Sequence, residues 1–423
     1  MSAHEASADA NDPTSDSAFA PSAYDPYGTF TQQNPKAFYL RLRDESPVHY
    51  DERYDCWYLS RFEDIWREEQ DLEAYTVVGG PTPPQLLKRV RGMPEEASPF
   101  ENQNFGDALA TLDPPTHTQL RGQLSPHFKP KAARELEALT RQLVRGYVDE
   151  LVEKGGGDVI GDLAMRTSVR IACTIVGFPL EKADWLAERV NRMNERDASG
   201  RAFSEHAFEG LVELHMYFHE TVARARQFPS DEPNVLNALL RAEADGQRIT
   251  DGDVASNLFL MIVGGTETLP KVFSAAVKRL AEHPDQRAAV VANPSLVPGA
   301  FREALRMDMP TQMLGRRVRR EKIVHGHRLL PEQGLLFLWA SANRDPREFP
   351  DPERYDIHRN APRLLSFGSG VHMCLGAHVA QMEGRVMLEE LLARIPEYET
   401  VPEGIERIRT EMFQGLAALP IRF

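Results

Sequence analysis

The sequence is poor in cysteine and has no long apolar run. Its three cysteines, Cys56, Cys173 and Cys374, are widely spaced in 423 residues. This excludes a disulfide framework and a cysteine-rich zinc site, and it favours a reducing compartment. Apolar runs such as residues 258–263 fall far short of the roughly 20 residues that cross a membrane, and the first residues lack the basic and apolar segments of a signal peptide. These absences predict a soluble, cytoplasmic protein.

Basic residues are fewer than acidic residues. The 49 lysines and arginines against 63 acidic residues give a net charge of −14. We therefore do not expect a nucleic-acid partner, because such binding requires the neutralisation of many phosphates. Residues 1–27 contain no lysine or arginine and are rich in Ser, Ala, Asp and Pro. They predict a disordered acidic tail, followed by a single domain over residues 28–423.

Apolar residues in the rest of the chain recur mostly with the spacing of amphipathic helices. The predicted helices cover residues 132–154, 162–176, 182–196, 205–227, 253–283 and 376–395. Alternating or turn-punctuated segments predict strands within residues 48–59, 322–339 and 418–423. The expected fold class is therefore mainly α with small β-sheets, with order beginning near Asn34.

The most informative segment is Phe367-Gly-Ser-Gly-Val-His-Met-Cys-Leu-Gly376. Gly368 and Gly370 allow the backbone to turn tightly and to approach a flat object closely. Cys374 directly precedes a helical pattern, so a thiolate there would face backbone N–H groups and a helix N-terminus, which stabilise its negative charge. The other two cysteines lie in apolar strand and helix patterns and are interpreted as inert core residues.

This segment resembles the haem loop of the cytochrome P450 family, Phe-x-x-Gly-x-x-x-Cys-x-Gly. The matching residues are Phe367, Gly370, Cys374 and Gly376. The resemblance implies that Cys374 is the axial thiolate ligand of the iron of haem b, a ligand that favours O–O cleavage. It also implies the family's mainly helical, triangular-prism fold, with one haem held between helices.

A second segment, Gly264-Gly-Thr-Glu-Thr268, resembles the oxygen-activation helix of the same family. Two adjacent glycines cost an ordinary helix roughly 1 kcal/mol each, which suits a helix that opens against a cofactor. We expect Thr268 to donate a hydrogen bond to the Gly264 carbonyl oxygen. The resemblance assigns Thr268 and Glu267 to proton delivery, with Glu267 relaying protons from solvent. Pro270 departs from the family pattern and predicts a kink that moves the relay groups.

Glu303-Ala-Leu-Arg306 resembles the Glu-x-x-Arg helix motif of the family. A spacing of three places both side chains on one helix face, although such pairs are also common on protein surfaces. The resemblance adds a second arginine, which we assign to Arg354 in the segment 349–355. The resulting Glu303–Arg306–Arg354 cluster is expected to be buried and structural.

The two propionates of haem require cations. The resemblance places them against His117 and Arg121, which are four residues apart on a helix that opens after Asp113-Pro-Pro-Thr. It adds Arg316 and His372 to the same set. The planar guanidinium of arginine is well suited to carboxylates.

The resemblance implies a monooxygenase that inserts one oxygen atom from O₂ into a C–H bond of a small hydrophobic substrate. Three cysteines are too few for a four-cysteine iron–sulfur cluster, so we expect electrons from separate proteins. The resemblance to the soluble bacterial members of the family implies that these are a ferredoxin and an NAD(P)H-dependent reductase. The candidate ferredoxin contacts are Lys129, Lys131, Arg134 and Arg385. Two alternatives are a peroxide-driven haem-thiolate enzyme, which the Glu267–Thr268 pair disfavours, and a non-catalytic haem-binding protein. The loop 77–112 and the helices within 182–227 are expected to cover the substrate.

Overall fold

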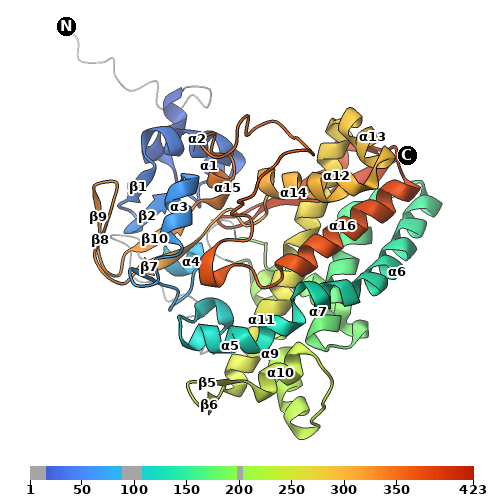
Figure 1. Cartoon of the computed structure of the whole chain (residues 1–423), viewed down its shortest axis with the longest axis horizontal. Coiled ribbons are helices and arrows are strands. Elements are labelled where there is room, and N and C mark those ends of the chain that lie inside the picture. Colours follow the sequence, from blue (N-terminus) through green and yellow to red (C-terminus); the bar gives the residue numbers. More distant parts are fainter. Residues whose placement is uncertain (1–15, 88–106, 198–202) are drawn as a thin grey trace.

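The computed structural model describes residues 16–87, 107–197 and 203–423. These residues form a mainly helical fold with small sheets, which confirms the predicted fold class (Figure 1). The helices are α1 Thr29–Gln33, α2 Pro35–Glu45, α3 Phe62–Glu68, α4 Pro83–Leu86, α5 Thr116–Leu124, α6 Pro130–Lys154, α7 Met165–Val176, α8 Ala183–Arg192, α9 Glu205–Gln227, α10 Val235–Arg241, α11 Asp251–Glu267, α12 Leu269–Glu282, α13 Pro284–Ala292, α14 Val297–Met307, α15 Trp339–Ala342 and α16 Ala377–Arg394. The strands are β1 Val48–Asp51, β2 Cys56–Leu59, β3 Tyr75–Thr76, β4 Gly156–Asp158, β5 Glu243–Ala244, β6 Gln247–Arg248, β7 Leu314–Val318, β8 Lys322–Val324, β9 His327–Leu329, β10 Gly334–Phe337, β11 Glu399–Thr400, β12 Glu406–Arg409, β13 Gln414–Ala418 and β14 Pro420–Arg422.

The largest sheet combines strands from residues 48–76 with strands from residues 314–337. Its order is β1-β2-β10-β7-β3, and only β2 and β10 run parallel. The predicted hairpin over residues 48–59 forms its β1–β2 edge. The register between β10 and β7 places Arg316 opposite Leu335, so this sheet fixes the position of one expected cofactor contact.

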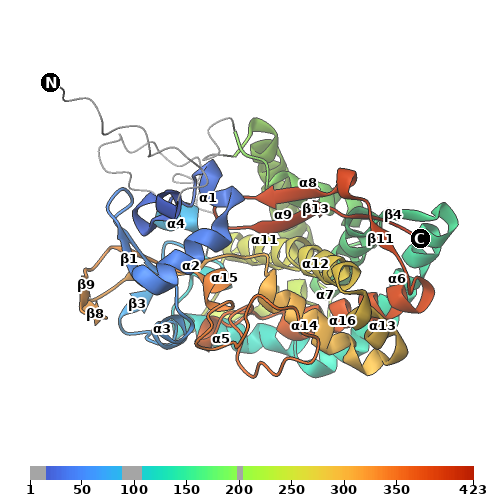
Figure 2. The same cartoon turned by 90° about the horizontal axis from the view of Figure 1, so that it is seen from above.

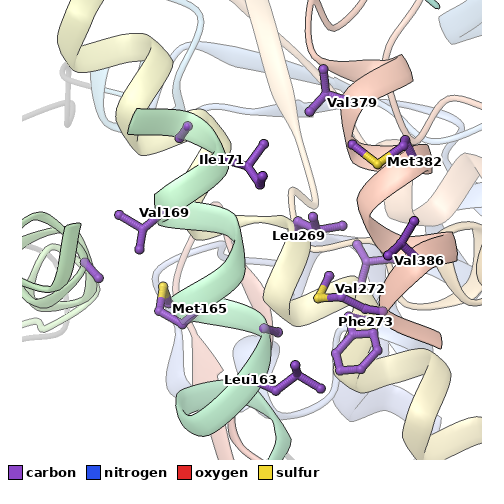
Figure 3. Packing of buried hydrophobic residues seen from close by; sticks show 14 of the residues in the cluster. Leu163, Met165, Val169, Ile171, Leu269, Val272, Phe273, Val379, Met382 and Val386 are labelled. Atoms are coloured by element: carbon purple, nitrogen blue, oxygen red, sulfur yellow. The ribbon is translucent and has the colours of Figure 1, made fainter. Parts of the chain in front are cut away.

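Two hydrophobic cores hold the fold together. One lies around the large sheet and includes Phe337 and Leu59, both fully buried. The other lies among the helices, where buried residues of α7, α12 and α16 face each other (Figure 3). In both views the sheet lies to one side of the long helices (Figures 1 and 2). Burial of a large apolar side chain stabilises the fold by roughly 1.5–3 kcal/mol, so these cores fix the helices that carry the site.

Helix ends follow local signals in the sequence. Helix α9 has the bounds predicted for it and begins after Ser204, whose Oγ accepts from the backbone N–H of Ala207 at 3.0 Å. Helix α11 begins with a capping box between Thr250 and Asp253. Helix α6 ends at Lys154 and is followed by Gly155, which has a positive φ of 70°.

The long helix predicted over residues 253–283 is two helices. Helix α11 ends at Glu267, Thr268 lies between them, and α12 begins at Leu269 with Pro270 in its first turn. The break confirms the predicted kink, because Pro270 has no N–H to continue the hydrogen bonds of α11. Among the described residues, one helical segment, Asp251–Glu282, is long and apolar enough to cross a membrane. In its most apolar stretch, 61% is buried inside the protein.

The prediction of disorder over residues 1–27 is wrong for residues 16–27. Two short 3₁₀ turns, Asp16–Phe19 and Pro21–Ala23, precede α1. Tyr24 is 1% exposed, and its ring packs edge-on against Tyr58 with 5.2 Å between centroids. The polar composition of the segment concealed this aromatic anchor, which pairs with residues far along the chain.

Candidate functional site

The loop before α16 has the predicted tight turns. Gly368 and Gly370 adopt positive φ values of 64° and 67°, which glycine adopts without strain. The backbone N–H of Cys374 donates to the Phe367 carbonyl oxygen at 2.8 Å and closes the loop. The same loop leads directly into α16, so Cys374 lies beside a helix N-terminus as expected.

The Cys374 thiol is accessible although protein surrounds it. The residue is exposed, yet burial raises the pKa of its thiol, while a backbone hydrogen bond at Gly376 and the charge of Arg121 act in the opposite direction. An exposed thiol that is also surrounded by protein is one whose accessible surface faces an internal space rather than the outside of the molecule. Such a thiol is protected from bulk oxidants and available to a ligand.

Three segments bring the four predicted propionate contacts together. Helix α5 supplies His117 and Arg121, strand β7 supplies Arg316, and the loop supplies His372. The rings of His117 and His372 lie 4.2 Å apart. Arg121 Nη2 donates to the Met373 carbonyl oxygen at 2.6 Å, which ties α5 to the loop next to Cys374.

These cations have no acidic partner in hydrogen-bonding contact within the described ranges. Neither ring nitrogen of the buried His117, nor Nε2 of His372, has a hydrogen-bond partner there. Burial, followed by the charge of Arg121, lowers the pKa of His117 to about 4. Burial also lowers the pKa of Arg316, although Glu69 and Asp113 favour its charged form from longer range. A buried arginine without an acidic partner and orphaned histidine ring nitrogens fit an anionic ligand such as the two haem propionates.

Glu69, which the sequence reasoning did not identify, holds the loop from the other side. It is 3% exposed, accepts from Ser369 Oγ at 2.5 Å and accepts from Trp339 Nε1 at 2.6 Å. Burial raises the pKa of its carboxyl group. No local motif marks this residue, because all its partners are distant in the chain.

The oxygen-activation segment has the predicted hydrogen bond. Thr268 Oγ donates to the Gly264 carbonyl oxygen at 3.1 Å. Gly264 is exposed between partly buried neighbours, and a Cβ added to it meets no atom within 4 Å. This face of α11 is therefore open, as a helix lying against a cofactor requires.

Glu267 does not face solvent, in contrast to the expected solvent relay. It is 2% exposed and forms an ion pair with Lys271. Its Oε1 also accepts from Asn194 Nδ2 at 2.7 Å. A spacing of four in a helical pattern could have indicated the pairing with Lys271, whereas nothing local indicates Asn194.

Glu303 and Arg306 form the predicted buried pair. Arg306 Nη2 lies 2.7 Å from Glu303 Oε1 and its Nε lies 2.9 Å from Oε2. The two side chains are 0% and 2% exposed. Arg306 also donates to the carbonyl oxygens of Asn343 and Pro352, so it ties α14 to the chain that leads to the loop.

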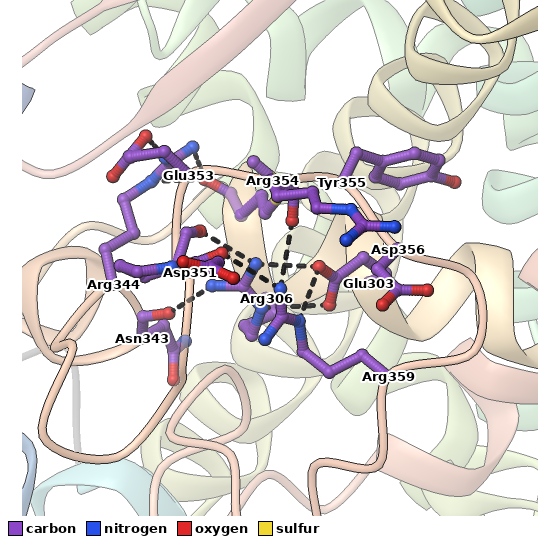
Figure 4. Close-up of polar contacts among 12 residues, drawn as sticks. Glu303, Arg306, Asn343, Arg344, Asp351, Glu353, Arg354, Tyr355, Asp356 and Arg359 are labelled. Atoms are coloured by element: carbon purple, nitrogen blue, oxygen red, sulfur yellow. Dashed lines mark hydrogen bonds and ion pairs between the residues drawn. The ribbon is translucent and has the colours of Figure 1, made fainter.

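The third member of this cluster is Arg359, and its assignment to Arg354 is wrong. Arg359 Nε donates to Glu303 Oε1 at 2.9 Å, whereas Arg354 is exposed and contributes only its backbone carbonyl, which accepts from Arg359 Nη2 at 3.1 Å. Figure 4 shows Arg306 and Arg359 both directed at Glu303. The segment turns near Asp351, which has a positive φ of 49°, and this path brings the later arginine inward.

The expected substrate cover lies partly outside the described residues. Residues 88–106 of the loop 77–112 and residues 198–202 between α8 and α9 belong to that undescribed part. Within the described part, α4 follows the glycine pair Gly79–Gly80, and α8 packs against α9 and α11.

The chain is similar to cytochromes P450 in sequence and in structure. The family model described as Cytochrome P450 matches residues 201–404. A putative cytochrome P450 123 of Mycobacterium tuberculosis is 32% identical over 399 residues, covering 94% of this chain and 96% of that protein. The 20-oxo-5-O-mycaminosyltylactone 23-monooxygenase of Streptomyces fradiae is 32% identical over 367 residues, covering 86% and 83%. A solved structure of cytochrome P450 CREJ in complex with (4-ethylphenyl) dihydrogen phosphate has a TM-score of 0.82 and 28% identity, covering 96% of this chain and 100% of that chain.

Proposed function

Because the chain belongs to the cytochrome P450 family of haem b monooxygenases, we propose that it inserts one oxygen atom from O₂ into a C–H bond of a small hydrophobic substrate, with Cys374 as the haem ligand. The observation that carries this proposal is the accessible Cys374 thiol in a closed loop beside basic side chains that have no acidic partner among the described residues. The haem, when bound, supplies the activation of O₂.

Cys374 would hold the iron and tune it. Burial disfavours its thiolate, and the positive charge of a bound iron would favour it. The hydrogen bond at Gly376 and the N-terminus of α16 then draw charge from the sulfur. These groups moderate the electron donation that the thiolate makes to the iron.

The propionates would be held by His117, Arg121, Arg316 and His372. Among the described residues, both ring nitrogens of His117 and Nε2 of His372 have no hydrogen-bond partner, and the two arginines have no acidic partner. Haem binding would therefore satisfy them without breaking an existing ion pair. Because three chain segments contribute, the cofactor also fastens α5, β7 and the loop to one another. Haem binding is therefore expected to stabilise the folded protein.

Thr268 and Glu267 would handle the protons. The Thr268 hydroxyl donates to Gly264, which leaves its oxygen lone pairs free to accept a proton or a hydrogen bond. Glu267 is the neighbouring acid and starts from a buried ion pair. This acid–alcohol pair favours O₂-driven turnover over the peroxide-driven alternative.

We propose that an acidic ferredoxin, reduced by an NAD(P)H-dependent reductase, supplies electrons on the α6 side of the loop. A hollow of about 710 Å³ there is lined by loop residues together with Arg134, Arg302, Arg363 and Arg385. Lys129, Lys131 and Arg134 are exposed, whereas Arg385 is paired with Glu137 at 2.6 Å. The three exposed cations are therefore the stronger candidates for steering a negative partner. A ferredoxin-driven rate that is unchanged by ionic strength would contradict this docking.

The Cys374→Ser variant tests the haem ligand and the function together. We expect it to lose the red-shifted absorbance of the reduced carbon monoxide complex that is typical of thiolate ligation, and to lose substrate-dependent product with ferredoxin, reductase and NADH. Cys173→Ala is the matched control, because Cys173 is a buried thiol on α7. An unaltered spectrum in the serine variant would overturn the ligand assignment. Equal turnover with peroxide alone would favour the peroxide-driven alternative, and a haem spectrum without turnover would favour a binding protein.

A further inference from the structure

Lys271 is a buried cation that no motif assigns to the site. Its side chain is 3% exposed, as is that of Glu267, and the two form an ion pair. Its Nζ also donates to the Glu267 carbonyl oxygen at 2.9 Å. Lys271 therefore contacts both the side chain and the backbone of the acid that precedes Thr268.

The Glu267 carboxylate is held asymmetrically. Lys271 and Asn194 both donate to Oε1. Within residues 16–87, 107–197 and 203–423, the buried Oε2 has no hydrogen-bond partner. One oxygen is thus fixed by two donors, while the other remains able to accept a proton.

The start of α12 and the approach of strand β13 fix the position of Lys271. The break at Thr268 starts α12 with a new first turn, from which Lys271 reaches back to the end of α11. Strand β13 approaches so closely that a Cβ added to Gly415 would lie 3.1 Å from the Lys271 Cβ and Cδ. Lys271 also lines a cavity of about 550 Å³ between α2, α12 and the β12–β13 hairpin, so its stem separates Glu267 from that cavity.

Burial makes this ion pair different from an ordinary helix pair. Lys278 and Glu282 have the same spacing on the same helix, but their side chains are 23% and 41% exposed. Removing one partner of an exposed ion pair lowers the stability of the protein only slightly. Losing one partner of a buried pair leaves a charge that must be neutralised, and a buried carboxylate does this by binding a proton.

We propose that Lys271 is a positioning residue for proton delivery: its ammonium group fixes the Glu267 carboxylate through Oε1 and leaves Oε2 to receive and pass on protons beside Thr268. This inference rests on the proposed role of Glu267. Without the cation, Glu267 retains a proton, and a carboxyl group with a higher proton affinity is a weaker acid. A role limited to capping the last carbonyl groups of α11 would not change the protonation of Glu267.

Infrared difference spectroscopy tests the ion pair without any turnover. The Lys271→Met variant of the holoenzyme is expected to gain a protonated-carboxyl C=O band. That band is absent from wild type and from Lys271→Arg, which keeps the cation. It should also be absent from the double variant Glu267→Gln/Lys271→Met, which has no buried unpaired charge and therefore guards against misfolding of the single variant. Lys278→Met is the matched control and should gain no band.

Coupling of NADH consumption to product tests the positioning role. Lys271→Met is expected to lose coupling by on the order of tenfold or more and to show a larger solvent isotope effect, Lys271→Arg to recover both, and Lys278→Met to match wild type. Wild-type coupling in Lys271→Met would overturn the proposal, as would absence of the infrared band. Wild-type coupling in Glu267→Gln would instead refute the proposed role of Glu267, and the infrared result would still report on the pair.

Discussion

Two clusters of basic side chains in this protein differ in their partners. Around Glu303, every carboxylate oxygen and both arginines are paired, Arg306 and Arg359 each lying 2.7–2.9 Å from an oxygen. Around His117 and Arg316, no acidic side chain of the described chain is within hydrogen-bonding distance. The first cluster is complete within the protein, whereas the second lacks an acid and is the one that we propose for the haem propionates.

The difference shows how to distinguish a structural cluster of charges from a binding cluster. A buried cation with its own acid stabilises the chain path, because removing either partner leaves a charge in the interior. A buried cation without an acid lowers stability until an anion binds. The Glu303 cluster is therefore expected to govern folding, and the His117 and Arg316 cluster to govern haem retention.

Removing the acid of the complete cluster has the largest expected effect. Glu303→Gln leaves Arg306 and Arg359 uncompensated, and we expect the free energy of unfolding to fall by about 3–5 kcal/mol. Chemical denaturation measures this change. The control is Glu73→Gln, whose exposed pair with Arg320 should contribute about 0.5 kcal/mol or less. Equal effects of the two variants would show that burial does not matter here.

The incomplete cluster predicts a loss of stability in acid before haem binds. The pKa of His117 is about 4 in the folded chain, against an ordinary value of 6.5. Between these values the unfolded chain binds a proton that the folded chain does not, so stability falls as the pH falls through this interval. The loss is on the order of 3 kcal/mol for this one group.

Denaturation of the haem-free protein across that interval measures the effect. His117→Gln should lack this contribution, and haem should reduce it in wild type because propionates favour the charged ring. A His117→Gln variant with the same acid sensitivity as wild type would place the titrating group elsewhere.

The smallest expected effect on stability comes from substituting the two arginines that are candidates for the third member of the Glu303 cluster. Arg359→Met removes one of two cations from Glu303, and we expect a loss of about 2 kcal/mol in the free energy of unfolding. Arg354→Met changes an exposed side chain and should alter stability by about 0.5 kcal/mol or less. The reverse order would restore the assignment made from the sequence.

The residues predicted correctly from the sequence lie within short motifs. The hydrogen bond from Thr268 to Gly264 and the ion pair of Arg306 with Glu303 both join residues three or four positions apart on a helix. The turns at Gly368 and Gly370 lie within one loop. In each case the local backbone fixes the distance, so the spacing is sufficient.

The errors and omissions concern partners that are distant in the chain or follow an irregular path. Arg354 was predicted in place of Arg359 because the segment after Asp351 is neither helix nor strand. No periodicity there shows which arginine turns inward. Glu69 meets Ser369 and Trp339 about 270–300 positions away. Tyr24 was hidden in a polar segment, although it packs against Tyr58.

The sequence by itself determined the mainly helical fold class, the turns of the cysteine loop, the hydrogen bond from Thr268 to Gly264 and the Glu303–Arg306 pair, because each depends on contacts within one turn or one loop. Only the tertiary structure decided that Glu267 is buried with Lys271 and Asn194, that Arg359 completes the Glu303 cluster, and that two histidines and two arginines converge with no acidic partner from the described part of the chain. The physical reason is that burial and charge pairing depend on how separate elements pack. That packing follows from the folding of the whole chain rather than from the spacing of residues along it.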